Sequence, residues 1–219
     1  MPLAIRHRDD PTPAIAPLPG LLVSRESDAG VMAALQGKPL AEMERRFAAG
    51  HRAYVAWWRG ERAAWGWVAT RSAEIGELAS TFTVPRGERY LWNFVTLATY
   101  RGLGIYPRLL DAIVRAESDE AERFWVAYAP ENHASGAGIR KAGFAMVADL
   151  SFDAEGRPAV RALRQTRDTD AARVLGLPQV EAALAQCWRC VRAGRGAMSC
   201  APESCRCDYQ QPKSGCAAA

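Results

Sequence analysis

The stretch YRGLGIYPRLL, from Tyr100 to Leu110, decides the predicted fold. It follows an aromatic and β-branched run at 90–96. It also opens a segment whose apolar residues recur at helical spacing, namely Ile105, Leu109, Leu110, Ile113 and Val114. The pattern predicts a strand, a glycine-containing turn and a helix over about 104–118. Glycines at 102 and 104 permit a sharp turn, and the free N–H groups at a helix start attract an anion. A phosphate-binding turn and a tight turn without a ligand both fit this stretch.

Two other nucleotide-binding motifs do not fit the turn. A phosphate-binding loop requires Lys and then Ser or Thr after its last glycine, where this chain has Ile105 and Tyr106. The Rossmann fingerprint requires a third glycine or an alanine at position 107, which is a proline. Pro107 is compatible with the first turn of a helix, because the N–H groups there have no intrahelical partner.

Length and composition indicate an ordinary globular protein. The 219 residues are 49% hydrophobic and 24% charged, with a net charge of +4, which fits one α/β domain with appendages. The mild positive charge gives no argument for a nucleic-acid partner. The chain has no run of ~18 apolar residues, and its first twenty residues lack the apolar core of a secretory signal. We therefore expect a cytoplasmic protein that does not bind membranes.

Periodicity and turn residues predict the remaining elements. Residues 1–20 are proline-rich and charged, and we expect an irregular lead-in there. Residues 31–49 predict two short helices separated near Gly37, and residues 51–71 a hairpin that turns at 59–62. A further helix is predicted at 132–142. Additional strands are predicted at 21–23, 74–84, 90–96, 123–128, 144–152 and 159–164, with the strand at 90–96 buried on both faces.

This order of elements predicts an α/β fold. We expect a mixed, mostly antiparallel sheet of about seven strands, with helices on both faces and a central βαβ unit built around the turn at 100–104. The predicted organisation is a lead-in at 1–20, the main domain at 21–165, and a C-terminal helix with a cysteine-rich tail at 166–219.

Two motifs together resemble the GNAT superfamily of N-acetyltransferases. The segment from Arg101 to Tyr106, RGLGIY, resembles the family's Gln/Arg-x-x-Gly-x-Gly/Ala motif at a strand-to-helix turn. The second family motif is an Asn that opens a helix and a Lys-x-Gly-Phe that closes it. Here these are Asn132 and the segment 141–144. One helix and one strand separate the motifs, as in the family, and the resemblance covers roughly 21–164 and implies a GNAT-like fold.

The resemblance implies an acyltransferase that moves an acetyl group from acetyl-CoA directly to an amine. The acceptor would be a small molecule or a peptide, and the protein a monomer or homodimer. The turn at 101–106 would hold the pyrophosphate, and the end of the preceding strand, with the start of the second helix, would contact the pantetheine arm. The implied cofactor-binding residues are Thr96, Leu97, Arg101, Gly102, Leu103, Gly104, Ile105, Tyr106, Asn132 and Ser135.

Departures from the family pattern leave the catalytic residues unassigned. Tyr106 stands where the motif has Gly or Ala, and we expect its ring in the core. Ile139 occupies the position of a tyrosine that protonates the leaving thiolate in many members, and it cannot donate a proton. The strand at 90–96 carries no carboxylate, only Asn93.

Glu74 and Glu77 are candidate general bases for the reaction. Carboxylates on strands are more often solvated edge residues, so this alternative stands beside the catalytic one. His51 and His133 are expected to be surface histidines rather than catalysts.

The last thirty-odd residues contain all six cysteines, in the pattern C-x2-C-x9-C-x4-C-x-C-x8-C. A helix is predicted over 177–191. The C-x2-C pair Cys187 and Cys190 is typical of structural zinc sites. A second pair could come from Cys200, Cys205, Cys207 or Cys216, and the ligand set chosen here is Cys187, Cys190, Cys200 and Cys205. Zinc is favoured over an iron–sulfur cluster, and a thiol-rich tail without a metal is the alternative. A second function class is therefore a non-catalytic module that binds or senses acyl-CoA and carries a metal in its tail.

Overall fold

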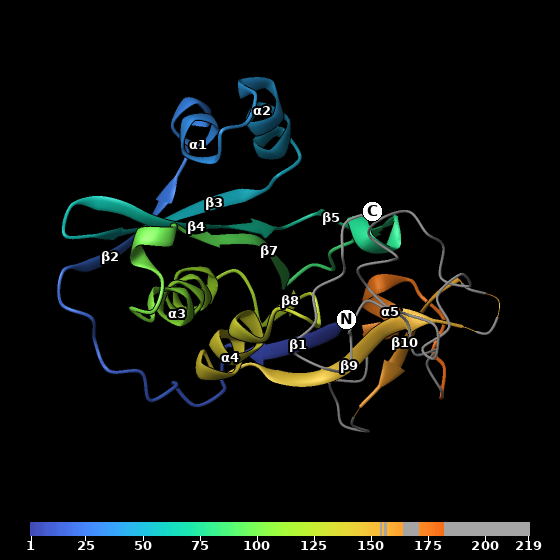
Figure 1. The fold of residues 1–219 in the computed structure, drawn as a ribbon. Coiled ribbons are helices and arrows are strands. Elements are labelled where there is room, and N and C mark those ends of the chain that lie inside the picture. Colours follow the sequence, from blue (N-terminus) through green and yellow to red (C-terminus); the bar gives the residue numbers. More distant parts are fainter. Residues whose placement is uncertain (154, 156, 164–170, 182–219) are drawn as a thin grey trace, which may run out of the picture.

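The computed structural model describes residues 1–153, 155, 157–163 and 171–181. An eight-stranded sheet in the order β10-β9-β1-β8-β7-β4-β3-β2 forms its centre (Figure 1). Within the described ranges its neighbouring strands are antiparallel, except β7 and β8, which are parallel. The strands are β1 (Pro2–His7), β2 (Leu21–Glu26), β3 (Arg52–Trp58), β4 (Glu61–Ala69), β7 (Glu88–Thr96), β8 (Arg123–Ala127), β9 (Ala145–Phe152) and β10 (Pro158–Ala162).

Helices cover both faces of this sheet. The helices α1 (Ala29–Gln36) and α2 (Leu40–Ala48) lie over one face, and α3 (Ile105–Glu117) and α4 (His133–Lys141) lie over the other (Figure 1). Met32, Met43 and Trp67 are fully buried on the α1–α2 side, and Leu109 and Phe124 on the α3 side. The predicted mixed, mostly antiparallel sheet with helices on both faces is confirmed, as is the βαβ unit β7-α3-β8.

The expected irregular lead-in was wrong for its first residues. Pro2–His7 forms β1, which pairs with β8 on one side and with β9 on the other. Leu3 and Ile5 are buried at 1% and 2% exposure, so this short apolar run is a central strand. The prolines and charges that follow it dominate the composition of residues 1–20 and hid the strand. Residues 11–18 have no regular secondary structure, as predicted.

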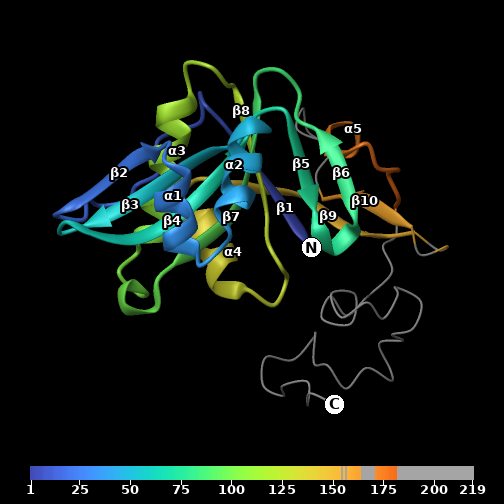
Figure 2. The same ribbon diagram turned by 90° about the horizontal axis from the view of Figure 1, so that it is seen from above.

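The single strand predicted at 74–84 was also wrong. That segment forms a separate two-stranded sheet of β5 (Ser72–Ile75) and β6 (Ser80–Thr83), joined by the short 3₁₀ helix η1 (Gly76–Leu78). The chain turns there because Ala79 adopts a left-handed conformation, with φ of 47°. The β5–β6 hairpin lies beside α5 (Ala171–Leu175), as Figure 2 shows, and Phe82 and Val174 belong to the same core cluster.

The helix predicted over 177–191 is not present in its described part. The short helix α5 ends at Leu175, and Gly176 follows with φ of 64°, a common way to end a helix before a proline such as Pro178. The chain then forms a bridge between Gln179 and Val160 on β10. Residues 182–191 lie outside the described residues.

The two halves of β7 differ. Its parallel pairing with β8 runs from Glu88 to Leu91 and ends there, so the second half pairs with β4 alone. The strand was predicted to be buried on both faces, and this is wrong for its second half, where Asn93 is exposed. Asn93 has φ of 52°, and the register with β4 shifts between Trp65 and Trp67. This bulge bends β7 away from β8.

Candidate functional site

A cavity of about 600 Å³, here called the α3–α4 pocket, lies between the second half of β7, the turn at 101–104, and the helices α3 and α4. The sequence-predicted residues that line it are Thr96, Arg101, Gly102, Gly104, Ile105, Tyr106, Asn132 and Ser135. Leu97 and Leu103 do not line it. The N–H of Leu97 donates to the carbonyl of Ala63 at 2.9 Å, and the side chain of Leu103 is 37% exposed to solvent.

The turn before α3 has the geometry of an anion site. Gly102 and Gly104 have φ of 84° and 70°, in the region that favours glycine. Gly104 precedes α3 without a side-chain cap, so the first N–H groups of the helix are open to the pocket. The positive end of the α3 dipole lies here, and Arg101 and Lys141, which also line the cavity, add two positive charges.

Arg108 fixes the shape of this turn. Its Nη1 donates to the carbonyl of Gly104 at 2.6 Å, and its Nη2 donates to the carbonyl of Ala16 at 2.6 Å. A Cβ at Gly104 would lie 2.5 Å from Arg108 Nη1. The turn therefore favours glycine for its backbone conformation, and a side chain at 104 would also have to displace the guanidinium of Arg108.

Tyr106 packs against the core and lines the pocket at the same time. Its ring lies 5.5 Å from that of Phe94, centroid to centroid, and its hydroxyl lies 3.3 Å from Ser135 Oγ. A Cβ at Gly138 would lie 2.5 Å from Tyr106 Cδ1, so a glycine on α4 makes room for the tyrosine that departs from the motif. Burial raises the pKa of Tyr106 to about 12. Ile139 is fully buried and faces the core.

The start of α4 is capped by Asn132. Its side-chain oxygen accepts a hydrogen bond from the N–H of Ser135 at 3.0 Å, as the residue before a helix often does. The amide NH₂ of Asn132 is not used by this cap. Asn132 can therefore cap the helix and still donate a hydrogen bond into the α3–α4 pocket.

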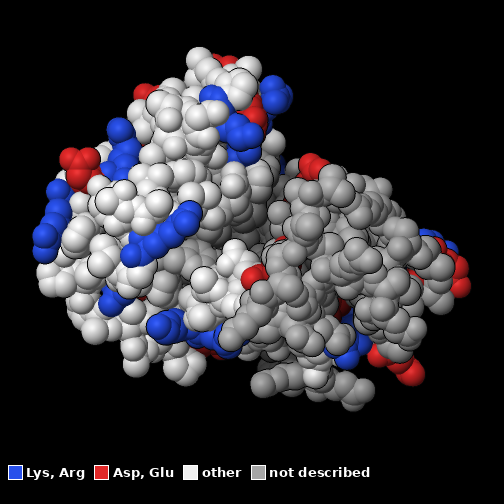
Figure 3. All heavy atoms as spheres, in the orientation of Figure 1, with Lys and Arg blue, Asp and Glu red and all other residues white. Residues whose placement is uncertain are grey.

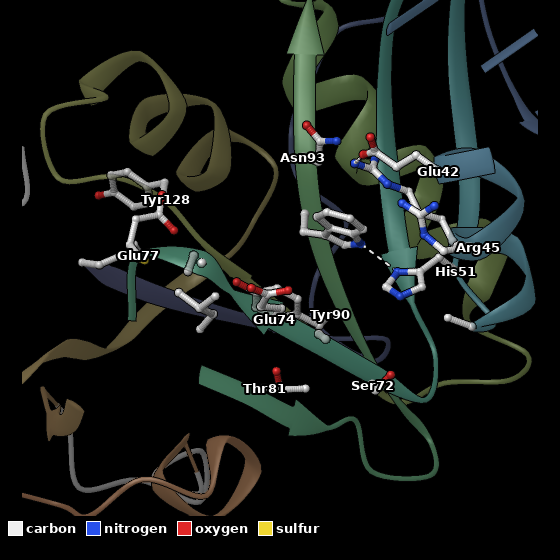
Figure 4. Close-up of a pocket in the computed structure, with 18 of the residues that line it drawn as sticks. Glu42, Arg45, His51, Ser72, Glu74, Glu77, Thr81, Tyr90, Asn93 and Tyr128 are labelled. Atoms are coloured by element: carbon white, nitrogen blue, oxygen red, sulfur yellow. Dashed lines mark hydrogen bonds and ion pairs between the residues drawn. The ribbon is translucent and has the colours of Figure 1, made fainter. Parts of the chain in front are cut away.

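A second cavity, here called the α2–β5 pocket, has a volume of about 790 Å³. It lies between α2, the β5–β6 hairpin, the middle of β7 and the residues that follow β8. Both sequence-predicted candidate bases line it. Figure 4 shows Glu74 and Glu77 among the residues that line this pocket. Glu74 is exposed and Glu77 is half-buried, so the solvated alternative still stands, and both residues line one cavity.

Several polar groups on the α2 side of this pocket are paired with each other. Arg46 pairs with Glu42 at 2.5 Å, and its guanidinium lies 4.7 Å from the ring centroid of Trp92. The Nε1–H of Trp92 donates to Nδ1 of His51 at 3.1 Å (Figure 4). Burial lowers the pKa of His51 below its usual value, and the charge of Arg46 lowers it further. His51 is therefore a neutral acceptor near pH 7. His133 is the first residue of α4 and lines neither pocket.

The two pockets meet on β7. Asn93 lines the α2–β5 pocket and the next residue, Phe94, lines the α3–α4 pocket. Tyr128, which is not among the sequence-predicted site residues, connects the α2–β5 pocket to α4. It follows β8, lines the α2–β5 pocket, and packs on α4, where a Cβ at Gly136 would lie 2.7 Å from its Oη. Its place just after a strand of the βαβ unit was the available signal.

The candidate metal ligands Cys187, Cys190, Cys200 and Cys205 lie outside the described residues. In the part of the chain that the structure describes, His, Cys, Asp and Glu form no cluster of three or more that could hold a metal ion. A helix with the length and apolar character needed to span a bilayer is likewise not found among the described residues.

Comparisons with known proteins give structural matches to acetyltransferases. No protein-family model matches the sequence, and no curated relative was found. A GCN5-related N-acetyltransferase from Kribbella flavida is similar in structure, with a TM-score of 0.47 and 15% identity over 66% of this chain and 53% of that one. This chain therefore matches about half the length of that protein.

Two further solved structures are similar at comparable levels. One is a putative GNAT acetyltransferase from Novosphingobium aromaticivorans, with a TM-score of 0.45 and 22% identity over 66% of this chain and 59% of that one. The other is the aminoglycoside N-acetyltransferase AAC(6')-Iy in complex with CoA, with a TM-score of 0.46 and 18% identity over 61% of this chain and 93% of that one. All three of these solved structures are described as acetyltransferases.

Proposed function

We propose that this chain is an N-acyltransferase that moves an acetyl group from acetyl-CoA to an amine acceptor. The observation that carries the proposal is the pair of pockets that meet on β7, at the point where its pairing with β8 ends. One pocket has the features of a nucleotide-phosphate site, and the other carries carboxylates. Two substrates that bind from opposite sides of one strand can react at the strand itself.

The α3–α4 pocket suits acyl-CoA in its charge and shape. Its anion-binding end is formed by the open N–H groups of α3 together with Arg101 and Lys141, and would take the pyrophosphate. Its other lining is the flank of β7, including Phe94 and Thr96, and the start of α4. Asn132 would donate to the pantetheine arm there. Leu97 is a weaker candidate than the other predicted residues because its N–H is already bonded to Ala63.

The proposed reaction is a direct transfer. The acceptor nitrogen attacks the thioester carbonyl carbon, so the C–N bond forms, the C–S bond breaks, and CoA leaves as a thiolate. The amine gives up one proton and the thiolate takes one. Groups suited to both transfers line the α2–β5 pocket, where the carboxylates of Glu74 and Glu77 can accept a proton and the hydroxyl of Tyr128 can donate one.

Calorimetric titration with acetyl-CoA tests the cofactor part of the proposal. Lys141 and Arg140 are adjacent, exposed residues in the last turn of α4, and of the two Lys141 lines the pocket. We expect Lys141→Glu to weaken acetyl-CoA binding about tenfold, since phosphate contacts are charge-assisted. Arg140→Glu is the matched control and should stay within about twofold of wild type. A wild-type protein that does not bind acetyl-CoA would refute the proposal.

Release of CoA thiol from acetyl-CoA in the presence of a panel of amines tests the transfer itself. Amine-dependent release supports the enzyme. Binding of acetyl-CoA without release for any amine would instead support a module that holds acyl-CoA without turning it over.

A further inference from the structure

The α2–β5 pocket carries opposite charges on opposite walls. Glu74 and Glu77 stand on the β5–η1 side, and Lys38 and Arg45 stand on the side formed by α2 and the residues before it. Figure 4 shows Glu74 and Glu77 on one side of the pocket and Arg45 on the other, with β7 between them. The pocket is therefore dipolar rather than uniformly acidic or basic.

These four charges are the ones that remain available to a ligand. Arg46 and Glu42 also line the pocket, but they pair with each other at 2.5 Å. Among the described residues, no ion pair or side-chain hydrogen bond engages Lys38, Arg45, Glu74 or Glu77. Lys38, Arg45 and Glu74 are exposed, and Glu77 is half-buried.

The surface view shows where basic side chains gather. On the face seen in Figure 3, basic side chains stand out on the part of the molecule formed by α1 and α2, with an acidic group among them. Lys38 and Arg45 add two positive charges that the Arg46–Glu42 pair does not neutralise.

The floor between the charged walls is aromatic. Tyr90 and Trp92 of β7 line the pocket between them, and Tyr90 is buried, with 5% of its surface exposed. Burial raises the pKa of Tyr90, and the negative charge of Glu77 raises it further, so Tyr90 is uncharged near pH 7. A low-dielectric floor strengthens the field that the two walls exert on a bound molecule.

We propose that the acceptor carries both a primary amine and an anionic group, as a free amino acid or a peptide with a free carboxylate does. The amine would face Glu74 and Glu77, on the side of the pocket that Tyr128 also lines, and the anionic group would face Lys38 and Arg45. This ligand is an acceptor only if the proposed acyl transfer holds, so that part of the inference rests on the proposed function. The ligand class itself follows from the pocket alone.

Other acceptor classes fit the pocket less well. A polyamine would place positive charge against Lys38 and Arg45, and a polyanion would place negative charge against the two glutamates. An amine without an acidic group would use one wall only. Like charges brought together at a binding site reject the wrong ligand more strongly than a missing contact does.

Calorimetry with short peptides in the absence of acetyl-CoA tests the ligand class. The probes are dialanine and trialanine, each as the free zwitterion, as the C-terminal amide and as the N-acetylated acid. We expect the better of the two zwitterions to bind about tenfold more tightly than its amide or its N-acetylated form. Equal binding of zwitterion and amide in the wild type would overturn the proposal.

Charge variants locate the two binding walls. Arg45→Glu and Lys38→Glu are each expected to abolish the preference for the free acid over the amide, and Glu77→Gln to reduce the preference for the free amine over the N-acetylated form. Arg62→Glu, an exposed change on β4 that lines neither pocket, is the control and should keep both preferences. Retained preferences in all three pocket variants would refute the assignment of the walls.

The acetyl-CoA titration separates this inference from the proposed function. Selective binding of the zwitterion without binding of acetyl-CoA would refute the proposed transferase activity and support the proposed ligand class. Equal acetyl transfer to simple amines and to amino acids would support the transferase activity and refute the proposed ligand class.

Discussion

Substituting Gly138 by alanine should change the stability of the protein in opposite directions, depending on the residue at position 106. Gly138 is buried inside α4, and its added Cβ would lie 2.5 Å from Cδ1 and 3.0 Å from Cε1 of Tyr106. Ring carbons that close to a methyl group must move. The ring of Tyr106 is held between Phe94 and the hydroxyl of Ser135, so the strain cannot be relieved by a simple rotation.

Two opposing free-energy terms set the size of the effect. Replacing a helical glycine by alanine stabilises a protein by about 0.5–1 kcal/mol through the entropy of the unfolded chain. Overpacking a filled site costs about 1–3 kcal/mol. We therefore expect Gly138→Ala to destabilise the wild type by up to about 2.5 kcal/mol, the difference between these two terms. In a Tyr106→Ala background the clash is absent, and the same substitution should stabilise by about 0.5–1 kcal/mol.

Urea denaturation of the four proteins of this double-mutant cycle measures the coupling. The cycle consists of wild type, Gly138→Ala, Tyr106→Ala and the double variant. Gly136→Ala is the control, because its Cβ would meet Oη of Tyr128 at 2.7 Å rather than Tyr106, and its effect should not depend on position 106. The reasoning is refuted if Gly138→Ala shifts stability by the same amount, with the same sign, in both backgrounds.

Three further perturbations test the buried polar groups. Asp111→Ala removes the carboxylate that Arg6 Nη1 binds at 2.9 Å in the core, and leaving that guanidinium without its ion pair should cost about 3–5 kcal/mol by urea denaturation. Glu117→Gln should lower stability by about 3 kcal/mol, measured in the same way, because this carboxylate accepts from Tyr54 Oη at 2.6 Å and pairs with two arginines. His51 is held neutral in the folded protein, with its pKa lowered from 6.5, so its contribution to stability is complete above about pH 6.5 and is lost as the pH falls below that value. In His51→Gln, which still offers an acceptor to Trp92, the slope of unfolding free energy against pH between 5 and 6.5 should be shallower than in wild type, and an unchanged slope would contradict this assignment.

Local signals predicted the central part of the fold. The strand, turn and helix around residues 90–117 carry their own period and their own glycines, and α4 carries its capping Asn132. Two elements could not be predicted from local patterns. The strand β1 is six residues long and its neighbours β8 and β9 are more than a hundred residues away, so its burial is a tertiary property. The β5–β6 hairpin turns at Ala79, and an alanine gives no sequence signal for the left-handed conformation that it adopts there.

The site was predictable to the same degree. Residues of the turn line the α3–α4 pocket because a strand-to-helix turn fixes its own backbone geometry. Glu74, Glu77 and Tyr128 reach the α2–β5 pocket only because the β5–β6 hairpin and the end of β8 come together in space. The sequence named the two glutamates as candidate bases beside a solvated alternative, and the one local signal for Tyr128 is its place just after a strand of the βαβ unit.

The ring of Tyr106 belongs to a set of contacts in which aromatic rings pack against glycines. Phe94 fills the space over Gly66, where a Cβ would lie 2.0 Å from Phe94 Cε1. The ring of Phe94 packs against that of Tyr106, and Tyr106 in turn lies against Gly138. Two glycines, one on β4 and one on α4, thus accommodate two aromatic rings across the α3–α4 pocket. Because each ring packs against the glycine it covers, a small residue at position 106 alone would leave a cavity beside Gly138.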